Sequence, residues 1–346
     1  MKRPIALSVV GYGLVGRRHA AAIGQVRGVE LASVVDPDPA ARALAEADGH
    51  ASLASLEACL ESGQLDGVIL ATPNALHVEQ ALVCVEAGCP VLIEKPIATR
   101  ASEAEGLVAL ADARGVPILV GHHRRHNPLI HRAREIIESG EIGEIRAVQA
   151  TCWFYKPDAY FDEAPWRRQV GAGPVSVNLV HDVDLLRYLC GDVATVRAVA
   201  RPAARGGQNE DVASALLEFA SGAIGTVTVS DSIVAPWSWE MTAGEYPIYP
   251  RTSQSCYLIG GSAGSLSLPD LRVWSHAKGG RDWWTPISAR SEIRDATDPL
   301  VNQIVHFADV IRGDARPLVS GEEGVRTLRV IEAIQQAAAT GACVKL

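Results

Sequence analysis

A glycine-rich turn near the start of the chain constrains its fold more than any other feature of the sequence. The segment Gly11-Tyr12-Gly13-Leu14-Val15-Gly16 follows the apolar run Ile5–Val10 and opens a helical pattern over Val15–Ile23. Glycines at this spacing allow a tight strand-to-helix turn whose free backbone N–H groups can bind a pyrophosphate. The context therefore predicts the first strand, loop and helix of a doubly wound α/β domain.

The alternation of strand and helix patterns continues to about residue 122. Short β-branched runs are separated by alanine-rich stretches, which is typical of a parallel sheet with crossover helices. The predicted strands are Ile5–Val10, Glu30–Val35, Gly67–Ala71, Pro90–Ile93 and Pro117–Val120, and the predicted helices are Val15–Ile23, Pro39–Ala47, Leu53–Glu61, Ala75–Ala87 and Ser102–Ala113. We therefore expect residues 1–122 to form a Rossmann dinucleotide-binding domain.

After this point the pattern changes to one of helices mixed with longer strands. The predicted helices are Pro128–Ser139, Gly173–Cys190, Pro299–Ile311 and Gly321–Ala339, and the predicted strands are Ile145–Phe154, Val193–Ala200, Val212–Phe219, Ala223–Ser230, Ser255–Ile259 and Ser265–Leu268. Gly222 marks a hairpin turn between two of the strands. Residues 123–346 are therefore expected to form an α+β domain with a large, mostly antiparallel open sheet.

Composition excludes several other classes of protein. A formal net charge of −8 offers no overall attraction to nucleic acid or to an anionic membrane, and no apolar run approaches the roughly 20 residues of a membrane span. The seven cysteines are scattered and include no C-x-x-C pair, which argues against a disulfide framework or a zinc site. We expect a soluble cytoplasmic protein with a small-molecule partner.

Asp36 extends the evidence for a dinucleotide site. It ends the second predicted strand, about 20 residues after Gly16, where a carboxylate accepts hydrogen bonds from a ribose 2′-hydroxyl. A 2′-phosphate at the same place would meet a negative charge. The sequence therefore predicts NAD rather than NADP, bound by Gly11, Gly13, Leu14, Val15, Gly16 and Asp36.

Two further motifs follow the next strands of the predicted parallel sheet. Thr72-Pro73-Asn74-x-x-His77 follows one strand, and Glu94-Lys95-Pro96 follows the next. Open α/β sheets bind their ligands at the carboxyl ends of the strands. We therefore include Thr72, Pro73, Asn74, His77, Glu94 and Lys95 among the expected cofactor-binding residues.

Taken together, the motifs resemble the Gfo/Idh/MocA family of sugar and polyol oxidoreductases. The glycine turn, T-P-N-x-x-H, E-K-P, V-G-H-H-R-R, W-R before a glycine-rich turn, and H-D-x-D occur in the family's order across essentially all 346 residues. The resemblance implies an NAD-dependent dehydrogenase that interconverts a secondary alcohol and a ketone on a sugar, polyol or cyclic polyhydroxy compound. It also implies a homodimer or homotetramer formed through the C-terminal sheet.

The resemblance assigns the catalytic roles to Lys95 and His181. Lys95 corresponds to the lysine that bonds the reacting oxygen and the nicotinamide ribose, and we expect the Lys95–Pro96 bond to be cis. His181 corresponds to the histidine on a helix of the second domain. Many relatives carry an aspartate four residues before this histidine, whereas this chain has Val177 there and Asn178 one place later.

Either another carboxylate tunes His181, or Lys95 and His181 work without one. Asn178, His181 and Asp184 fall at i, i+3 and i+6 on one face of the predicted helix, which makes Asp184 the nearest candidate in the sequence. Asn178 is then expected to bind a substrate hydroxyl group. An acid at position 184 also has Arg187 within reach as an alternative partner.

Further side chains are expected to line the substrate site. They are His123, Tyr160, Arg167, Asn178, His181 and Trp237. The three histidines in His122-His123-x-x-His126 have helical metal spacing, but no cysteine or carboxylate completes a ligand set nearby, so we expect no metal and a structural His126. A packed core or an oligomer contact is an equal alternative for each aromatic residue.

Two other functions fit the same scaffold. One is an enzyme that retains NAD and cleaves a glycosidic bond through transient oxidation, with no net formation of NADH. The other is a non-catalytic regulator that binds NAD and senses a sugar. The presence of both Lys95 and His181 counts against the regulator, and resemblance of fold alone excludes neither function.

Overall fold

The computed structural model describes residues 3–63, 65–276, 280–293 and 297–346. The chain divides into two compact units. The first contains residues 1–127 and 297–328, and the second contains residues 128–296 and 329–346. The long helix α11 (Gly321–Thr340) begins in the first unit and ends in the second.

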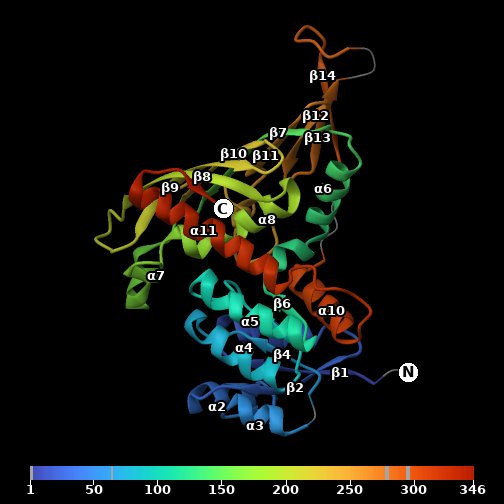
Figure 1. Ribbon diagram of the computed structural model, residues 1–346, viewed down its shortest axis with the longest axis vertical. Helices are drawn as coiled ribbons and strands as arrows, with labels where there is room; N and C mark the ends of the chain where they lie inside the picture. The colour runs from blue at the N-terminus through green and yellow to red at the C-terminus, as the bar shows by residue number, and fades with distance from the viewer. Residues whose placement is uncertain (1–2, 64, 277–279, 294–296) are drawn as a thin grey trace. The chain divides into compact units, whose positions relative to one another are not determined.

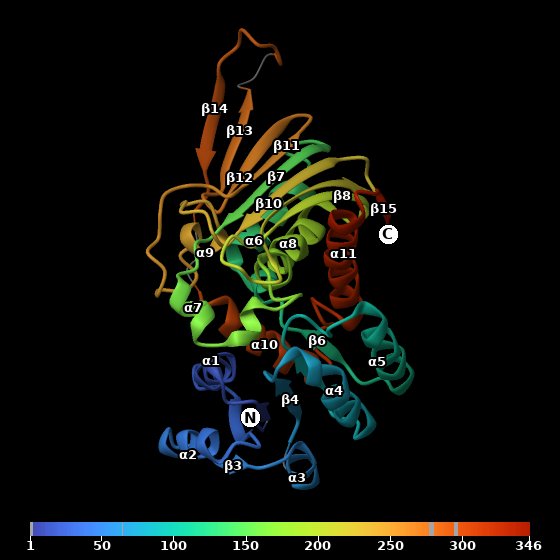
Figure 2. The ribbon, with the colours of Figure 1, turned by 90° about the vertical axis from the view of Figure 1, so that its left-hand side faces the viewer.

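The first unit is built on a parallel sheet of six strands with helices on both faces (Figures 1 and 2). The strand order is β3-β2-β1-β4-β5-β6. Its strands are β1 (Ile5–Val10), β2 (Val29–Val35), β3 (Ser52–Leu53), β4 (Gly67–Leu70), β5 (Val91–Ile93) and β6 (Ile118–Val120), and its helices are α1 (Leu14–Ile23), α2 (Pro39–Ala47), α3 (Leu56–Glu61), α4 (His77–Glu86), α5 (Ala101–Arg114) and α10 (Pro299–Ile311). This order confirms the predicted Rossmann fold.

The central strands of this sheet are buried on both faces. All six residues of β1 are buried, as expected for a parallel strand covered by helices on either side. Ile5, Leu7 and Val9 pack in one apolar cluster with α1 and α10, whereas Val10 packs in a second cluster with α4 and α5. The alternation of side chains along β1 therefore supplies two separate helix-covered cores.

Helix α10 belongs to the first unit, although the sequence division placed every residue after 122 in the second domain. Leu300, Ile304 and Phe307 are buried in the cluster that β1 forms with α1. A Cβ on Gly67 of β4 would lie 3.2 Å from the ring of Phe307, so the helix lies directly against the sheet. This long-range packing is invisible in local sequence patterns because the amphipathic helix contacts strands far earlier in the chain.

The second unit contains a mostly antiparallel sheet of nine strands, in the order β14-β13-β12-β11-β7-β10-β9-β8-β15. Only β7 and β10 pair in parallel. Its strands are β7 (Ile145–Trp153), β8 (Val193–Pro202), β9 (Glu210–Phe219), β10 (Ile224–Ser230), β11 (Tyr257–Gly261), β12 (Gly264–Leu268), β13 (Arg272–His276), β14 (Ile287–Ser291) and β15 (Val344–Lys345), and its helices are α6 (Pro128–Glu138), α7 (Asp158–Asp162), α8 (Val180–Cys190) and α9 (Trp239–Thr242).

Helices α6 and α8 and the end of α11 cover one face of this sheet (Figure 2). Along β9 and β10 buried residues alternate with exposed or half-exposed ones, and Leu217, Val227 and Val229 point into the helix-covered core. The opposite face exposes Leu216, Ile224 and Leu258. The predicted α+β domain with an open antiparallel sheet is therefore confirmed.

Some element boundaries differ from the predicted ones. Helix α3 begins at Leu56 rather than at Leu53, because the Ser55 hydroxyl accepts a hydrogen bond from the N–H of Ala58 and caps the helix. Leu53 pairs with β2 as part of β3 instead. Strands β13 and β14 were not predicted, because their side chains show little apolar alternation and β14 is exposed throughout.

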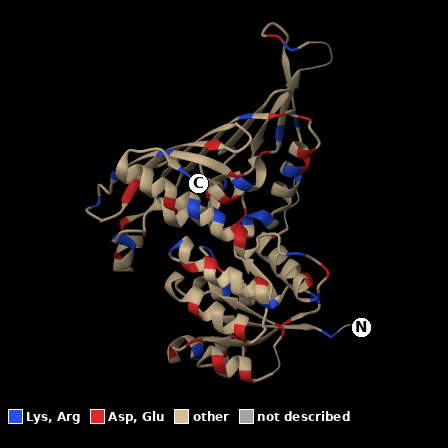
Figure 3. Cartoon of the chain, viewed as in Figure 1, with Lys and Arg blue, Asp and Glu red and all other residues tan. Residues whose placement is uncertain are grey.

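Acidic and basic residues are interspersed along the helices of each unit (Figure 3). All seven cysteines are free thiols, and only Cys343 is exposed. No helix within the described residues is long and apolar enough to cross a membrane.

Candidate active site

The glycine turn lies at the carboxyl end of β1, in the middle of the first sheet. Gly11 has φ +89°, and a Cβ there would lie 2.8 Å from the carbonyl oxygen of Ala71. A Cβ on Gly16 would lie 1.8 Å from the carbonyl oxygen of Gly11, so the turn itself requires both glycines. A Cβ on Gly13, in contrast, would meet no described atom within 4 Å. The turn is therefore open at Gly13, where a pyrophosphate can approach the backbone.

Asp36 directly follows β2, the strand beside β1, and its carboxylate holds the glycine turn. Oδ2 accepts a hydrogen bond from the N–H of Tyr12 at 2.8 Å, and Oδ1 accepts one from the N–H of Asp38 at 2.9 Å. A carboxylate has about four acceptor positions, so capacity remains for a ribose hydroxyl group. Leu14 and Val15, at the first turn of α1, are 74% and 42% exposed. These residues fit an NAD molecule that would cover the exposed apolar side chains.

The Thr72-Pro73-Asn74 loop follows β4, and His77 ties it to the next loop. Pro73 and Asn74 are exposed. His77 is fully buried, with Nδ1 2.8 Å from the carbonyl oxygen of Pro96 and Nε2 2.9 Å from that of Thr72. Burial lowers the pKa of the His77 imidazole. We infer that His77 joins the two loops, whereas Thr72, Pro73 and Asn74 keep their proposed place beside the cofactor.

Glu94 and Lys95 follow β5, and the Lys95–Pro96 bond is cis, as expected. Glu94 is 8% exposed; its Oε1 accepts a hydrogen bond from Nε2 of His19 at 2.7 Å, and its Oε2 accepts one from the N–H of Lys95 at 3.1 Å. Burial raises the pKa of Glu94, but the hydrogen bond and charge of His19, then the charges of His123 and Lys95, bring it down to about 2. The ionised carboxylate therefore fixes the backbone at Lys95.

His123 begins the short turn His123–His126 after β6. Its charge is one of those that lower the pKa of Glu94, and the place of His123 in the substrate site stays a prediction. His126 is buried, and its ring lies 5.1 Å from that of His306. No group of three or more histidine, cysteine or carboxylate side chains that could hold a metal occurs in the described part of the chain.

The helix that carries His181 starts irregularly. Residues Val175–Leu179 form one π turn and α8 begins at Val180, where the sequence predicts a single helix from Gly173. Glu210 of β9 accepts a hydrogen bond from the N–H of Val175 at 2.9 Å, and burial raises the pKa of its carboxyl. The prediction that Asn178 and His181 share one face assumes a regular α-helix. The helix instead changes from a π turn to an α-helix between the two residues, and a π turn is wider than an α turn.

Acidic residues around His181 are buried. His181 itself is 8% exposed, and Asp182 and Asp184 are 0% and 1% exposed. The hydroxyl group of Tyr257 on β11 donates a hydrogen bond to Oδ1 of Asp182, which links α8 to the sheet. Arg187 pairs with Asp192 at 2.6 Å. The pairing of His181 with Asp184 stays a prediction.

Lys156, which the sequence analysis missed, contacts the expected substrate residue Asn178. Nζ of Lys156 donates a hydrogen bond to Oδ1 of Asn178 at 2.7 Å and lies 3.8 Å from Oδ2 of Asp231. Arg205 bonds the other oxygen of Asp231 at 3.1 Å. Burial lowers the pKa of Lys156, and the charge of Asp231 opposes that change. No motif marks this lysine because its partners come from other strands and loops.

Two of the other expected substrate residues lie beside Lys156. The Tyr160 ring has Nζ of Lys156 5.2 Å from its centre and the guanidinium carbon of Arg167 3.9 Å from it. Arg167 also donates to the carbonyl oxygen of Tyr160 at 2.5 Å. The fold therefore brings Tyr160, Arg167 and Asn178 together around one buried lysine.

Trp237 lies apart from this group. Its ring contacts that of Trp153 edge-on at 5.6 Å, and both line a hollow of about 350 Å³ with Thr226, Thr228 and Leu258. The hollow is on the open face of the sheet, opposite α8, because the two threonines alternate with the buried Val227 and Val229. Trp237 therefore lies away from Tyr160, Arg167 and Asn178, and its expected role in the substrate wall stays a prediction.

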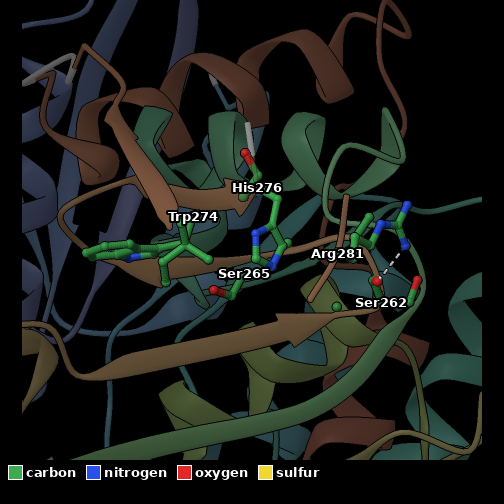
Figure 4. Close-up of a pocket in the computed structure, with 10 residues that line it drawn as sticks. Ser262, Ser265, Trp274, His276 and Arg281 are labelled. Carbon is green, nitrogen blue, oxygen red and sulfur yellow. Dashed lines mark hydrogen bonds between the residues drawn. The ribbon is translucent and has the colours of Figure 1, made fainter. Parts of the chain in front are cut away.

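A second hollow, of about 300 Å³, lies among β11 to β14 (Figure 4). Trp274, His276 and Ser265 line it, and Arg281 donates a hydrogen bond to the carbonyl oxygen of Ser262 at 2.9 Å. It contains none of the residues expected from the sequence to bind cofactor or substrate.

Both parts of the chain match models of known families. Residues 5–122 match the oxidoreductase family with an NAD-binding Rossmann fold, and residues 130–267 match the GFO/IDH/MocA C-terminal domain.

Individual relatives agree with these matches. The rhizopine catabolism protein MocA of Rhizobium meliloti is 30% identical over 64% of this chain and 70% of its own length. The 1,5-anhydro-D-fructose reductase of Ensifer adhaerens is 28% identical over 95% of this chain and 96% of its own. The solved WlbA dehydrogenase from Bordetella pertussis, in complex with NADH and UDP-GlcNAcA, is 30% identical with a TM-score of 0.80, and the match covers 99% of each chain.

Proposed function

Because the chain belongs to the Gfo/Idh/MocA family of oxidoreductases, we propose that it is an NAD-dependent dehydrogenase of a sugar, polyol or cyclic polyhydroxy compound. The reaction interconverts a secondary alcohol and a ketone, with NAD⁺ reduced to NADH and one proton released. The observation that carries the proposal is the glycine turn, which is open at Gly13 and flanked by the carboxylate of Asp36.

The side chains of the protein bind the substrate and move its proton. When bound, the nicotinamide exchanges a hydride with the carbon atom that bears the hydroxyl group. Lys95 binds the reacting oxygen through its ammonium group and stabilises the negative charge that develops on that oxygen. His181 moves the hydroxyl proton between the substrate and solvent.

Glu94 supports Lys95 in this scheme. Its carboxylate bonds the N–H of Lys95 and is held in turn by His19, so the backbone that carries the lysine is fixed before the substrate binds. Thr72, Pro73, Asn74 and His123 complete the nicotinamide end of the site.

A homo-oligomer formed through the open face of the second sheet is part of the proposal, as is a cytoplasmic location. Leu258 and Ile224 are 50% and 51% exposed on that face. Exposed apolar side chains on the uncovered face of a sheet are typical of a surface that another subunit covers. The free thiols suit a reducing compartment.

The test is a panel of alditols, aldoses, inositols and polyhydroxy acids with NAD⁺, followed by the absorbance of NADH. Lys95→Ala should lower kcat by about 10²- to 10⁴-fold, whereas NADH binding, measured by nicotinamide fluorescence, stays close to that of the wild type. Arg100→Ala, which removes an exposed cation five residues later, is the control.

Two results would contradict the proposal. One is a Lys95→Ala variant with nearly wild-type kcat, which would remove Lys95 from the mechanism. The other is turnover of a glycoside without net NADH, which would identify an enzyme that retains its cofactor.

A further inference from the structure

Lys156 is a buried cation that the proposed reaction does not use. Its side chain is 7% exposed, yet its only close polar contact is the neutral Oδ1 of Asn178 at 2.7 Å, within the described residues. Oδ2 of Asp231 is 3.8 Å away, beyond hydrogen-bond distance, and Arg205 holds the other oxygen of the same carboxylate at 3.1 Å. A buried charge is stable only when an opposite charge and hydrogen bonds compensate it, and the nearest carboxylate oxygen here lies too far from Nζ for a hydrogen bond.

Lys156 also decides which way the amide of Asn178 faces. An ammonium group only donates hydrogen bonds, so the amide must present its oxygen to Lys156. The Nδ2 group of Asn178 is then left as a donor for a ligand. Asn178 lies in the π turn Val175–Leu179, and His181 follows three residues later as the second residue of α8.

Arg167 adds a further donor beside the same tyrosine ring. Its Nη1 bonds the carbonyl oxygen of Tyr160 and the exposed Glu163, but its buried Nε has no hydrogen-bond partner among the residues that the structure describes. The Arg167 side chain as a whole is 22% exposed, but an N–H donor at a buried atom is costly without an acceptor, and a ligand oxygen would supply one.

We propose that Lys156, Asn178 and Arg167 bind a carboxylate group of the substrate, so that the enzyme acts on a polyhydroxy carboxylic acid. The reason is the kind of hydrogen bond that the three side chains offer. A substrate hydroxyl group both donates and accepts, whereas these side chains offer only donors, and an ionised carboxylate only accepts. Hydrogen bonds from cationic donors to a carboxylate are also shorter and stronger than neutral ones.

This inference rests on the proposed dehydrogenase function, because that function defines which molecule is the substrate. Binding measurements test the inference without any turnover. Matched pairs differ only in having a carboxylate in place of a terminal CH₂OH: D-gluconate and D-glucitol, D-galactonate and galactitol, and D-mannonate and D-mannitol. Calorimetry with the NADH-saturated protein should show at least one acid binding about tenfold or more tightly than its alditol. D-glucitol 6-phosphate serves as the phosphate-bearing alternative.

Variants locate the source of that preference. Lys156→Met and Arg167→Met should each reduce the acid-to-alditol affinity ratio by about 10- to 100-fold. Lys156→Met leaves Asp231 bonded to Arg205, so no buried carboxylate is left alone. Arg146→Met removes an exposed cation that pairs with Glu144, and as the matched control it should leave the ratio unchanged.

Several outcomes overturn the inference. The acids and alditols could bind equally well, or none of them could bind. The phosphate ester could bind more tightly than every acid, or the preference for acids could survive in both Lys156→Met and Arg167→Met. Failure of the proposed function gives a different result, because an acid would then bind with the expected preference but produce no NADH.

Discussion

At the residue scale, three carboxylates hold the loops of the proposed site by accepting backbone hydrogen bonds. Asp36 bonds the N–H of Tyr12 in the glycine turn, Glu94 bonds that of Lys95, and Glu210 bonds that of Val175 before α8. The ionised Glu94 accepts the stronger kind of hydrogen bond, whereas burial raises the pKa of Glu210 and disfavours its ionised form. The backbone positions of the glycine turn, of Lys95 and of the segment before α8 therefore each depend on one carboxylate side chain.

Asp36 gives a prediction about the cofactor. Repulsion between the carboxylate and a 2′-phosphate should make NADP binding about 3 kcal/mol less favourable than NAD binding, which corresponds to about two orders of magnitude in kcat/KM. Asp36→Ser should narrow the difference between the two cofactors, chiefly by weakening NAD. Kinetics with both cofactors measure this, and Asp38→Asn, which removes a nearby charge, is the control. A wild-type preference for NADP would contradict the prediction.

Glu94 gives a prediction about stability and pH. Its pKa is lowered from 4.5 to about 2 in the folded chain, so the folded state favours the ionised form. The resulting stabilisation, about 3 kcal/mol, is present above pH 4.5 and is lost as the pH falls toward 2. Glu94→Gln should be less stable at neutral pH, and its free energy of unfolding should change less on acidification.

Urea denaturation between pH 7 and the lowest pH at which the protein stays folded measures this difference. Glu86→Gln changes an exposed carboxylate at the end of α4 and serves as the control. Equal dependence on pH in the wild type and Glu94→Gln would show that Glu94 is not held ionised by the fold.

At the scale of elements, helix α8 depends on the sheet for its position. Asp182 is fully buried, and the hydroxyl group of Tyr257 donates to it from β11. Tyr257 also stacks on Trp239, with ring centres 5.7 Å apart. The residue next to His181 is therefore attached to the middle of the nine-stranded sheet.

Tyr257→Phe removes the hydroxyl donor from this buried carboxylate and keeps the ring. The variant should lose about 1 to 3 kcal/mol of stability, because a buried acceptor loses a partner. Urea denaturation measures the loss, and Tyr155→Phe, at a residue 45% exposed, is the matched control. A loss no larger than that of the control would show that the contact does not stabilise α8.

At the scale of the whole molecule, the two units differ in how their sheets are covered. Helices cover both faces of the parallel sheet but one face of the antiparallel sheet (Figure 2). The uncovered face exposes Leu216, Ile224 and Leu258, and it contains the hollow lined by Trp153 and Trp237. This face is where the proposed subunit contact would bury apolar surface.

Leu258→Glu should weaken the proposed oligomer, because burying the new carboxylate in an apolar contact is costly. Light scattering coupled to size-exclusion chromatography should show a lower mass than that of the wild type at the same concentration. Val234→Glu is the control, since Val234 is 84% exposed in a loop outside the sheet. An unchanged mass in Leu258→Glu would place any subunit contact elsewhere.

The local sequence determined the parallel strands β1, β2, β4, β5 and β6 of the first unit and the crossover helices between them. Its parallel strands are short apolar runs buried on both faces, so a run such as Ile5–Val10 marks a strand without knowledge of its neighbours. The glycine turn was predicted from its position between a strand and a helix, Asp36 from its spacing after that turn, and the cis Lys95–Pro96 bond from the family resemblance. The family resemblance assigned His181, and the helical spacing from His181 then singled out Asn178.

Only the tertiary structure decided the features that depend on distant contacts. Phe307 packs α10 against the first sheet, Tyr257 of β11 bonds Asp182 of α8, and Lys156 reaches Asn178 from the loop after β7. The exposed strand β14 lacks the apolar alternation that marks a strand locally. Local patterns report backbone preference and burial, whereas the partner of a buried charge is set by which strands and helices the folded chain places side by side.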